Sequence, residues 1–322
     1  MSFQLDHIVI AVSDLATAIA DYHTLGFKVL EGGVHASGAT HNALIIFADG
    51  TYLELLAATG AAPAPESLDF SLMLASGEGL SGFALCVPNL AEAAAGLRER
   101  GVAVSALREG ARQTPNGERL AWQLALVNDG FLPFFIEDLT PRPLRVPTDP
   151  NFTAHPNGVR GIGGIEVVTP DLAASQARYS TLLGADSEPA DMPDFVAFAL
   201  QNAQLVISAP HRETAESVIR WSAAPLEALE DQLDAIFSAE LPSDVAALLH
   251  QSGQMWQQYE AEIRRQVADR ADYLAARHNA EALYAVRLWQ GEAAGEFSLA
   301  DQRLTHGVRF TAQAFFDAED AD

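Results

Sequence analysis

The stretch that decides the fold is Leu5-Asp6-His7-Ile8-Val9-Ile10-Ala11-Val12-Ser13-Asp14-Leu15, because its layout occurs three times in the chain. Each copy consists of an apolar strand, a short polar or proline break, and a leucine that opens a helix. The other copies are Leu80-Ser81-Gly82-Phe83-Ala84-Leu85-Cys86-Val87-Pro88-Asn89-Leu90 and Ile162-Gly163-Gly164-Ile165-Glu166-Val167-Val168-Thr169-Pro170-Asp171-Leu172. A layout that recurs along a chain indicates a repeated structural unit.

The helix after each strand has both of its ends marked in the sequence. A residue type that caps helix N-termini precedes each leucine, and a glycine follows the apolar helical pattern at the point where a helix can stop. The cap and stop pairs are Asp14 with Gly26, Asn89 with Gly101, and Asp171 with Gly184. We therefore expect three strand-helix units in the first two thirds of the chain.

Further strands follow each helix. After the first helix we expect strands at 27–30, 41–47 and 51–57, the last two joined by the tight-turn pair Asp49-Gly50. After the second helix we expect strands at 102–107, 119–127 and 132–138, and after the third helix strands at 195–200 and 203–208. The pattern predicts an α+β fold with a βαβββ module at residues 1–60, a second at 80–140, and a shortened third module at 155–210.

The apolar period changes after residue 210. Leu226, Leu229 and Leu233 recur at helical spacing, and so do Tyr259 and Ile263. Residues 211–322 are therefore predicted to form an α-helical C-terminal region. One hypothesis makes this region a docking or oligomerisation unit for which the modules are a scaffold.

Composition limits the classes of partner. The 322 residues carry a formal net charge of −24, which opposes binding to nucleic acid or to an anionic membrane. The single cysteine, Cys86, lies in an apolar run and has no partner for an internal disulfide. The chain opens on a strand-like segment and has no apolar run of membrane-spanning length, so we expect a cytoplasmic protein.

Two groups of motifs resemble a known family. The segments Leu5-Asp6-His7-Ile8-Val9 and Asp49-Gly50-Thr51-Tyr52-Leu53-Glu54-Leu55, with Leu120-Ala121-Trp122 and Leu132-Pro133-Phe134-Phe135-Ile136-Glu137 later in the chain, are similar to the glyoxalase-like domain family of the vicinal oxygen chelate superfamily. The resemblance spans about residues 1–210. It implies curved mixed sheets that form a cup, in which side chains on the first and last strands of each module hold a divalent metal ion.

The resemblance also implies which residues form the site. His7 takes the first-strand position of the first module, and Glu54 and Glu137 take the last-strand positions of the first two modules. The fourth position falls on Gly82, which has no donor atom. One histidine and two carboxylates suit Zn, Ni, Mn or Fe, with open positions for water or for substrate oxygens.

Other interpretations of these residues remain open. His7 is also explained as a structural histidine, and Glu54 and Glu137 as inward ion pairs with Arg112, Arg119 or Arg142. His41 either replaces the missing ligand or lines the pocket, and Arg112 and Trp122 are candidates for contact with an anionic or planar substrate. A second possible metal pair, His278 with Glu281, has the spacing of one helix turn, which is common by chance.

The first functional hypothesis is a metal-dependent lyase or isomerase that acts on a small oxygenated molecule. The ion held by His7, Glu54 and Glu137 would polarise the substrate, and Glu54 or Glu137 would move a proton. A dioxygenase would require His41 as a further ligand. The alternative is a metal-free protein that binds or sequesters a small molecule and has a helical interaction tail, an interpretation that Gly82 favours. Paired modules close each cup, so the third, shorter module is expected either to find its partner within the chain or to pack across a homodimer.

Overall fold

The described part of the chain belongs to one compact unit. The computed structural model describes residues 3–209, 282–290, 304–306, 308 and 310–314, apart from 65–69, 71–73, 75–77, 115–116, 128–132, 170, 185–189 and 193–194. Residues 1–208 and 282–322 form this unit, and residues 209–281 form a second one. No helix among the described residues is long and apolar enough to span a membrane.

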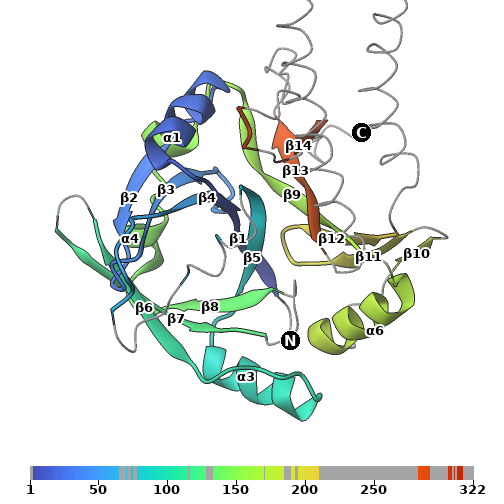
Figure 1. Cartoon of the computed structure of the whole chain (residues 1–322). Helices are drawn as coiled ribbons and strands as arrows, with labels where there is room; N and C mark the ends of the chain where they lie inside the picture. Colours follow the sequence, from blue (N-terminus) through green and yellow to red (C-terminus); the bar gives the residue numbers. More distant parts are fainter. Residues whose placement is uncertain are drawn as a thin grey trace, which may run out of the picture. The chain divides into compact units, whose positions relative to one another are not determined.

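The first two modules build one eight-stranded mixed sheet, in the order β2-β3-β4-β1-β5-β8-β7-β6 (Figure 1). The first strands of the two modules, β1 and β5, pair antiparallel at its centre, and each lies parallel to the last strand of its own module. The elements are β1 (Gln4–Ala11), α1 (Leu15–Thr24), β2 (Leu30–Val34), β3 (Thr40–Ile46), β4 (Tyr52–Ala58), β5 (Gly79–Cys86), α3 (Leu90–Glu99), β6 (Arg108–Gln113), β7 (Arg119–Ala125) and β8 (Phe134–Asp138).

This sheet curls until its two edge strands meet, which makes it nearly a barrel. An isolated antiparallel bridge joins His35, directly after β2, to Arg112 of β6, and the backbone N–H of Ala36 donates to the carbonyl of Ala111 (2.8 Å). We call this junction the β2–β6 seam. Helices α1 and α3 lie outside the curled sheet (Figure 1). The inner face is therefore a cup that the chain encloses by itself.

The predicted helix ends are confirmed. The side chains of Asp14, Asn89 and Asp171 accept hydrogen bonds from backbone N–H groups in the first turns of α1, α3 and α6 (Leu172–Leu183). The stop glycines have φ values between 80° and 84°, where a side chain would be strained. The predictions of the second strands at 27–30 and 102–107 are wrong, because these strands follow those ranges, as β2 at Leu30–Val34 and β6 at Arg108–Gln113. β2 includes two glycines and pairs with β3 through a register shift at Gly33.

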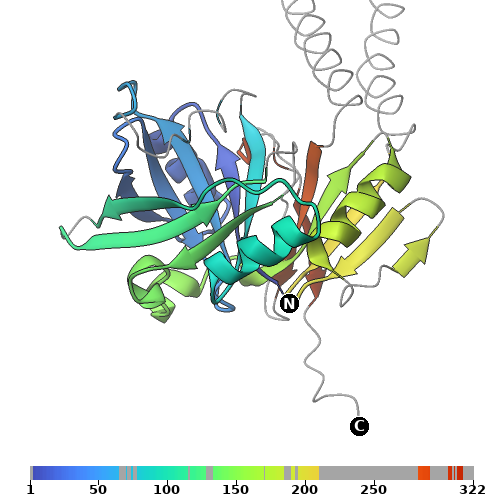
Figure 2. The same cartoon turned by 90° about the horizontal axis from the view of Figure 1, so that it is seen from below.

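The third module contributes to a second sheet, of six strands in the order β10-β11-β12-β9-β13-β14 (Figure 2). The sequence predicted only two strands after the helix of this module. The structure has a third, β10, directly after the helix, so the module is not shortened. The remaining elements of the chain are α4 (Arg142–Arg145), α5 (Pro150–Thr153), β9 (Val159–Val168), β10 (Ala190–Met192), β11 (Phe195–Ala199), β12 (Gln204–Ser208), β13 (Ala282–Gln290) and β14 (Phe310–Ala314).

Two strands lie where the sequence predicted helix. β13 pairs antiparallel with β9 and parallel with β14, as β5 pairs with β1 and β8 in the first sheet. β13 and β14 thus correspond to the first and last strands of a fourth module. The prediction of an entirely helical region from 211 to 322 is wrong for these two segments. The predicted helices around Leu226 and Tyr259, and the pair His278 and Glu281, lie outside the described residues.

All four first strands carry a register shift at the same place. The shifts lie between Leu5 and His7, between Leu80 and Gly82, between Ile162 and Gly164, and between Leu283 and Ala285. A β-bulge adds one residue to a strand and redirects the side chains beside it. The shared bulge confirms the repeat and extends it to β13. It also identifies Gly82, Gly164 and Ala285 as the residues at the position of His7.

Two apolar layers separate the faces of the first sheet. On the outer face, Ile8, Phe83 and Phe135 belong to the large core cluster that also contains residues of α1 and α3. On the inner face, a smaller cluster contains Val9, Leu56, Ala84, Leu120, Trp122, Leu124, Phe134 and Ile136. Because alternate strand residues point to opposite faces, these clusters show which strand positions face the cup.

Candidate functional site

A histidine and a carboxylate face each other inside the cup. Val9 of β1 is the register partner of Glu54 of β4, and the bulge at Asp6 sets His7 on the same inner face. His7 Nε2 lies 3.4 Å from Glu54 Oε2, and both side chains are largely buried, with 4% and 12% of their surface exposed. The His7 ring stacks on Tyr52 and meets Phe134 edge-on. The structure thus brings together two of the three predicted metal ligands.

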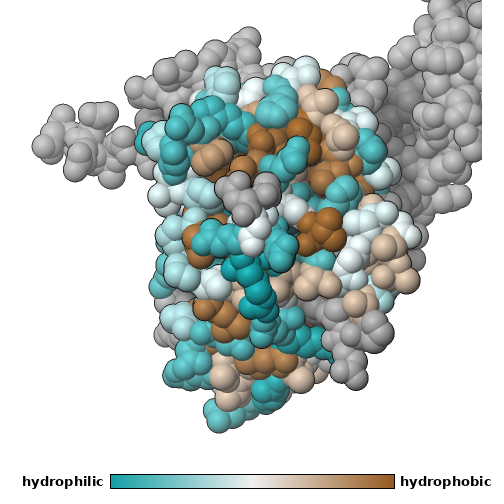
Figure 3. Space-filling model, turned by 90° about the vertical axis from the view of Figure 1, so that its left-hand side faces the viewer, coloured by the Kyte–Doolittle hydropathy of each residue, from teal (hydrophilic) through white to brown (hydrophobic). Residues whose placement is uncertain are grey.

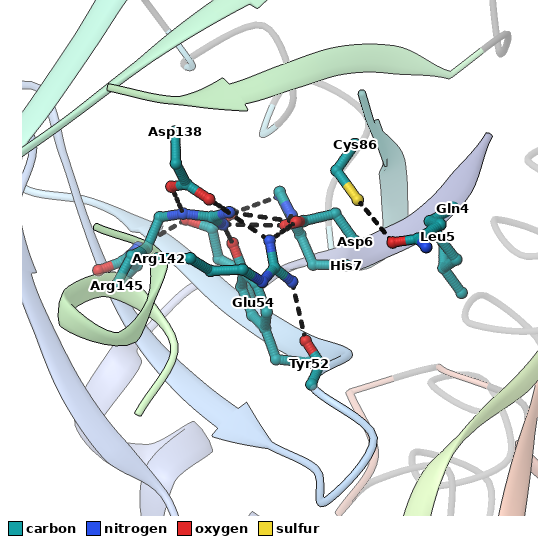
Figure 4. A network of polar contacts seen from close by, with 12 residues as sticks. Gln4, Leu5, Asp6, His7, Tyr52, Glu54, Cys86, Asp138, Arg142 and Arg145 are labelled. Atoms are coloured by element: carbon teal, nitrogen blue, oxygen red, sulfur yellow. Dashed lines mark hydrogen bonds and ion pairs between the residues drawn. The ribbon is translucent and has the colours of Figure 1, made fainter. Parts of the chain in front are cut away.

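The other ring nitrogen of His7 is held by Asp6. The distance from His7 Nδ1 to Asp6 Oδ1 is 2.7 Å, and Asp6 is fully buried. Asp6 is also paired with Arg142 and with Arg145, whose Nη1 lies 2.9 Å from Asp6 Oδ1. Both arginines come from α4, and Figure 4 shows their guanidinium groups converging on Asp6 and Asp138. This network fixes the end of β1 that carries His7.

The protonation states of Asp6, His7 and Glu54 follow from their contacts. Burial favours neutral Asp6, but the charge of Arg145 and the hydrogen bond from His7 hold the Asp6 pKa well below its usual value. Burial would lower the His7 pKa, but hydrogen bonds to Asp6 and Glu54 raise it above 6.5. Burial opposes ionisation of Glu54, yet its contacts with His7, His35 and Asn42 lower its pKa to about 2. Glu54 is therefore a carboxylate, and protonated His7 is favoured.

A second histidine, His35, stands on the other side of Glu54, and sequence reasoning missed it. His35 Nε2 lies 3.7 Å from Glu54 Oε1. Its Nδ1 is 2.8 Å from Thr40 Oγ1. The amide nitrogen of Asn42 donates to Glu54 Oε1 (2.6 Å) and lies 3.4 Å from His35 Nε2, where it can donate to the tautomer of His35 that carries its proton on Nδ1.

The surroundings of His35 favour its neutral form. Burial lowers its pKa below 6.5, the charge of Glu54 raises it, and the charge of Arg112 lowers it further. The ring contacts Phe70 and Trp122. At the start of β3, the polar residues Thr40 and Asn42 face inward, on the same side of the strand as Leu44. This was the signal in the sequence that a polar group stands opposite them.

The predicted substrate-binding residues lie on different faces of the sheet. Trp122 and Arg112 face the cup, since Trp122 belongs to the inner cluster and Arg112 is the register partner of Leu120. His41 neighbours Asn42 on β3 and so points to the outer face. It lines a cavity of about 810 Å³ beside the β2–β6 seam, which Arg112 and Asn42 also reach.

Glu137 is not part of the site. Ala84 of β5, which corresponds to Val9, has Phe134 as its partner in β8, so Phe134 occupies the position of Glu54. Glu137 lies three residues further on and faces outward. There it accepts hydrogen bonds from the backbone N–H of Leu90 (2.7 Å) and from Gln123 Nε2 (2.6 Å). The prediction of Glu137 as a metal ligand and catalytic residue therefore disagrees with its position at the N-terminus of α3.

The predicted arginine pairs are also different in the structure. Arg142 binds Asp6 rather than Glu54 or Glu137, and exposed Arg119 pairs with Glu109 (2.6 Å). Cys86 is partly buried, and burial raises its pKa to about 11, which makes its thiol a poor nucleophile and agrees with a structural role.

Comparison with known proteins agrees with this architecture. The model of a family described as "Glyoxalase-like domain" matches residues 5–183, more than half of the chain. The chain belongs to this glyoxalase-like domain family. Its curved mixed sheets have the fold of the vicinal oxygen chelate superfamily, as the sequence predicted. No curated protein matches the chain in sequence.

Solved structures extend the likeness of this glyoxalase-like protein beyond the family match. A hypothetical protein from Staphylococcus aureus is 13% identical, covers 97% of this chain and 100% of its own, and has a TM-score of 0.63, which shows a shared fold. Methylmalonyl-CoA epimerase from Mycobacterium tuberculosis is 25% identical over 42% of this chain and 88% of its own, with a TM-score of 0.33. A mutant 4-hydroxymandelate synthase from Streptomyces coelicolor is 12% identical over 91% and 72%, with a TM-score of 0.44.

The four metal-ligand positions that the superfamily resemblance implies do not fit a metal ion in this glyoxalase-like chain. They hold His7, Glu54, Gly82 and Phe134, so only two have donor atoms. Both nitrogens of His7 already face carboxylates. Among the described residues, no group of three or more His, Cys, Asp or Glu side chains is arranged to hold a metal. The predicted Zn, Ni, Mn or Fe site is thus incomplete at these positions.

Proposed function

We propose that the cup of the first sheet transfers a proton on a small oxygenated molecule, in an isomerase or lyase reaction. The observation that carries the proposal is the position of Glu54, a buried carboxylate between two imidazoles that have opposite pKa shifts. Titratable neighbours whose environments separate their pKa values provide an acid and a base at the same pH. His7 is the acid of this pair, and His35 is the base.

The chemistry needs no further reactant. His35 Nε2 accepts a proton from a carbon next to a carbonyl, so the C–H bond breaks and its electron pair delocalises onto the carbonyl oxygen. The positive charge of His7, whose two ring nitrogens face Asp6 and Glu54, stabilises the resulting enolate oxygen electrostatically. The imidazolium of His35 then returns the proton to the same carbon. With an α-hydroxy substrate it can instead protonate the neighbouring carbon, and the proton of the hydroxyl group then moves to the former carbonyl oxygen. Glu54 holds the charge of His7 and orients Asn42, and Trp122 and Arg112 contact the substrate.

The absence of donors at Gly82 and Phe134 supports a second candidate, a metal-free binding or sequestration protein. Both candidate functions use the same cup, but they assign different roles to its residues. In the binding candidate, the His7–Glu54 pair only fixes the inner face. The opposite pKa shifts of His7 and His35 favour the proton-transfer candidate, because a binding pocket does not require them.

Proton transfer can be measured before the natural substrate is known. A panel of small α-hydroxy aldehydes and ketones is incubated with the protein in D₂O, and ¹H NMR follows the exchange of the carbon-bound hydrogen for deuterium. We expect exchange by the wild type and a loss of about 10²-fold or more in Glu54→Gln and His35→Gln, typical of a lost acid–base group. The matched controls are Glu137→Gln on the outer face and His23→Gln on the exposed side of α1, which should retain the rate.

The pH dependence of exchange provides a separate check. His35 must be neutral, and its lowered pKa places the acidic limb below pH 6.5; His7 must be protonated, and its raised pKa places the alkaline limb above pH 6.5. We expect a bell-shaped rate with a plateau around this value. Equal rates in wild type and both site variants would reject proton transfer by these groups and leave the binding candidate.

A further inference from the structure

The ring of His35 contacts two aromatic side chains inside the cup. Its centroid is 4.9 Å from that of Phe70, with an angle of 43° between the ring planes, and 6.1 Å from that of Trp122, which it meets edge-on. Only 5% of the His35 surface is exposed. Outside the cup, on the side of the molecule that carries β2 and the β6–β7 hairpin, apolar areas adjoin hydrophilic ones (Figure 3). The aromatic surroundings of His35 thus contrast with this mixed outer surface.

Phe70 comes from the segment that connects the first two modules, residues 59–78. Near the start of this segment, the backbone N–H of Ala64 donates to the carbonyl of Ser37 (2.8 Å), two residues after His35. Further along, Phe70 packs against the inner apolar cluster of the first sheet. The segment is therefore tied to the chain beside His35 and also supplies one of the rings that His35 contacts.

The position of Phe70 places it at the boundary between His35 and solvent. The two nitrogens of His35 have polar neighbours, Thr40 Oγ1 at 2.8 Å and the amide nitrogen of Asn42 at 3.4 Å. These groups act at the edge of the ring, in its plane, so the rest of the enclosure must come from apolar side chains. Phe70 contacts the buried ring and is itself only half-buried. A side chain with these two properties separates the ring from water.

Burial is the main influence on the ionisation of His35. Among the described residues, the charged and titratable groups that act on it are Glu54 of β4, Arg112 of β6 and His41 of β3. Burial lowers the pKa of His35 more than any of these charges does; Arg112 and His41 lower it further, and Glu54 raises it. Shortening Phe70 would admit water and leave all three groups in place. It would therefore change the enclosure of His35 without changing a charge.

We propose that Phe70 is a positioning residue of the enzyme, whose ring excludes water from His35 and keeps the imidazole ready to accept a proton from the substrate. Phe70 acts through His35 and not on the reacting atoms. Exclusion of water also strengthens the electrostatic interactions among the groups inside a site. This inference deepens the proposed function and rests on it for the role of His35 as the base. The contact between Phe70 and His35 does not depend on that role.

An NMR titration tests the shielding without any reaction. The full-length protein is labelled with ¹³C at histidine Cε1, and the His35 signal is assigned by its loss in His35→Gln. In Phe70→Ala we expect the pKa of His35 to rise from its lowered value toward 6.5, because water reaches the ring. Phe70→Leu, which keeps an apolar side chain, should stay closer to the wild type.

Two controls separate this effect from a general loosening of the cup. Leu144→Ala shortens another half-buried side chain that packs on the same inner cluster, but from α4, and should leave the titration of His35 unchanged. The His7 signal is an internal control, because the rings that His7 contacts are Tyr52 and Phe134. In the wild type, a nuclear Overhauser effect between the ring protons of Phe70 and His35 checks the contact without a substitution.

Deuterium exchange then links the shielding to catalysis. Phe70→Ala should lose rate on the acidic limb, where less of its His35 is neutral, and keep the wild-type rate on the alkaline limb, which depends on His7. A merely structural role would lower the rate equally at every pH.

The proposal is overturned if His35 titrates in Phe70→Ala as in the wild type, if Leu144→Ala changes its titration as much, or if the Overhauser effect is absent. The titration is independent of turnover. A raised pKa without exchange on any substrate would therefore reject proton transfer and retain the shielding, whereas exchange with an unchanged titration would do the reverse.

Discussion

The two sheets of this chain share a scaffold but not a site. Both have first strands paired antiparallel at the centre, each with a bulge at the same position, and both place a last strand parallel to its first strand. In the first sheet the four corresponding positions hold His7, Glu54, Gly82 and Phe134. In the second sheet they hold Gly164, Val206, Ala285 and Thr311. The comparison teaches that the backbone of the repeat needs the bulge, whereas the histidine and the carboxylate are an addition that only the first sheet carries.

The cavities beside the two sheets also differ, and the larger one lies beside the first sheet. The cavity beside the first sheet measures about 810 Å³, whereas the one lined by Gly164, Glu166 and Arg287 in the second sheet measures about 10 Å³, room for no more than one water molecule. The hydroxyl of Ser208 donates a hydrogen bond to Glu166 Oε1 (2.9 Å), and Arg287 Nη1 donates one to Gln204 Oε1 (3.2 Å). Polar groups in the second sheet thus satisfy each other at the surface.

The largest effect should come from breaking the buried network of the first sheet. Asp6→Asn removes the charge that Arg145, Arg142 and His7 share. We expect it to lower the free energy of unfolding by about 3 to 5 kcal/mol, because the buried guanidinium of Arg145 keeps only Asp138 as its carboxylate partner. Denaturant unfolding measures the change. Glu166→Gln is the matched variant of the second sheet and should cost less than about 1 kcal/mol. Similar losses in both would contradict the contrast between the sheets.

A smaller effect should follow from opening the seam that closes the first sheet. Gly33 has a φ of 126° and no room for a Cβ, whereas Gly38 has a φ of 76° and nothing within 4 Å. Both alanine variants introduce backbone strain, but only Gly33→Ala adds a clash. We expect costs of about 2 to 4 kcal/mol for Gly33→Ala and about 1 kcal/mol for Gly38→Ala. Equal thermal shifts would mean that the edges can separate freely.

The smallest effect should be a pH dependence confined to the half that carries His7. The folded pKa of His7 is raised above its unfolded value of 6.5, so its stabilisation is fully present below that value and is lost as the pH rises through the folded pKa. His7→Gln should therefore cost about 1 to 3 kcal/mol at pH 6 and less at pH 9, as measured by urea unfolding. If the loss in the free energy of unfolding caused by His7→Gln grew as the pH rose, the raised pKa of His7 would be contradicted.

Most of the fold could be predicted from the sequence because the repeat is local. Caps such as Asp14, stop glycines such as Gly26 and the Asp49-Gly50 turn act within a few residues of each other. β13 was missed for the opposite reason. Its run from Leu283 to Trp289 pairs with β9, more than a hundred residues earlier, and its surroundings have helical periodicity. No local signal distinguishes such a segment from a helix.

The site was predicted only where strand register was evident. His7 and Glu54 meet because both lie in long strands of clear alternation. Glu137 was aligned with Glu54 by residue type, and its offset of three residues from Phe134 turns it to the other face. His35 follows a strand that contains two glycines and lacks alternation, so its direction depends on the seam, which forms only when β6 arrives.

The position of the second unit between β12 and β13 has a consequence for synthesis of the protein. The first sheet and α4 are complete once Arg145 has left the ribosome, but β9 must wait for β13, which is separated from β12 by residues 209–281. At typical translation rates this delay lasts roughly 4 to 15 s. During that time the edge of β9 that later pairs with β13 is an unprotected template for other chains, so a chaperone that covers this edge would raise the yield of native protein.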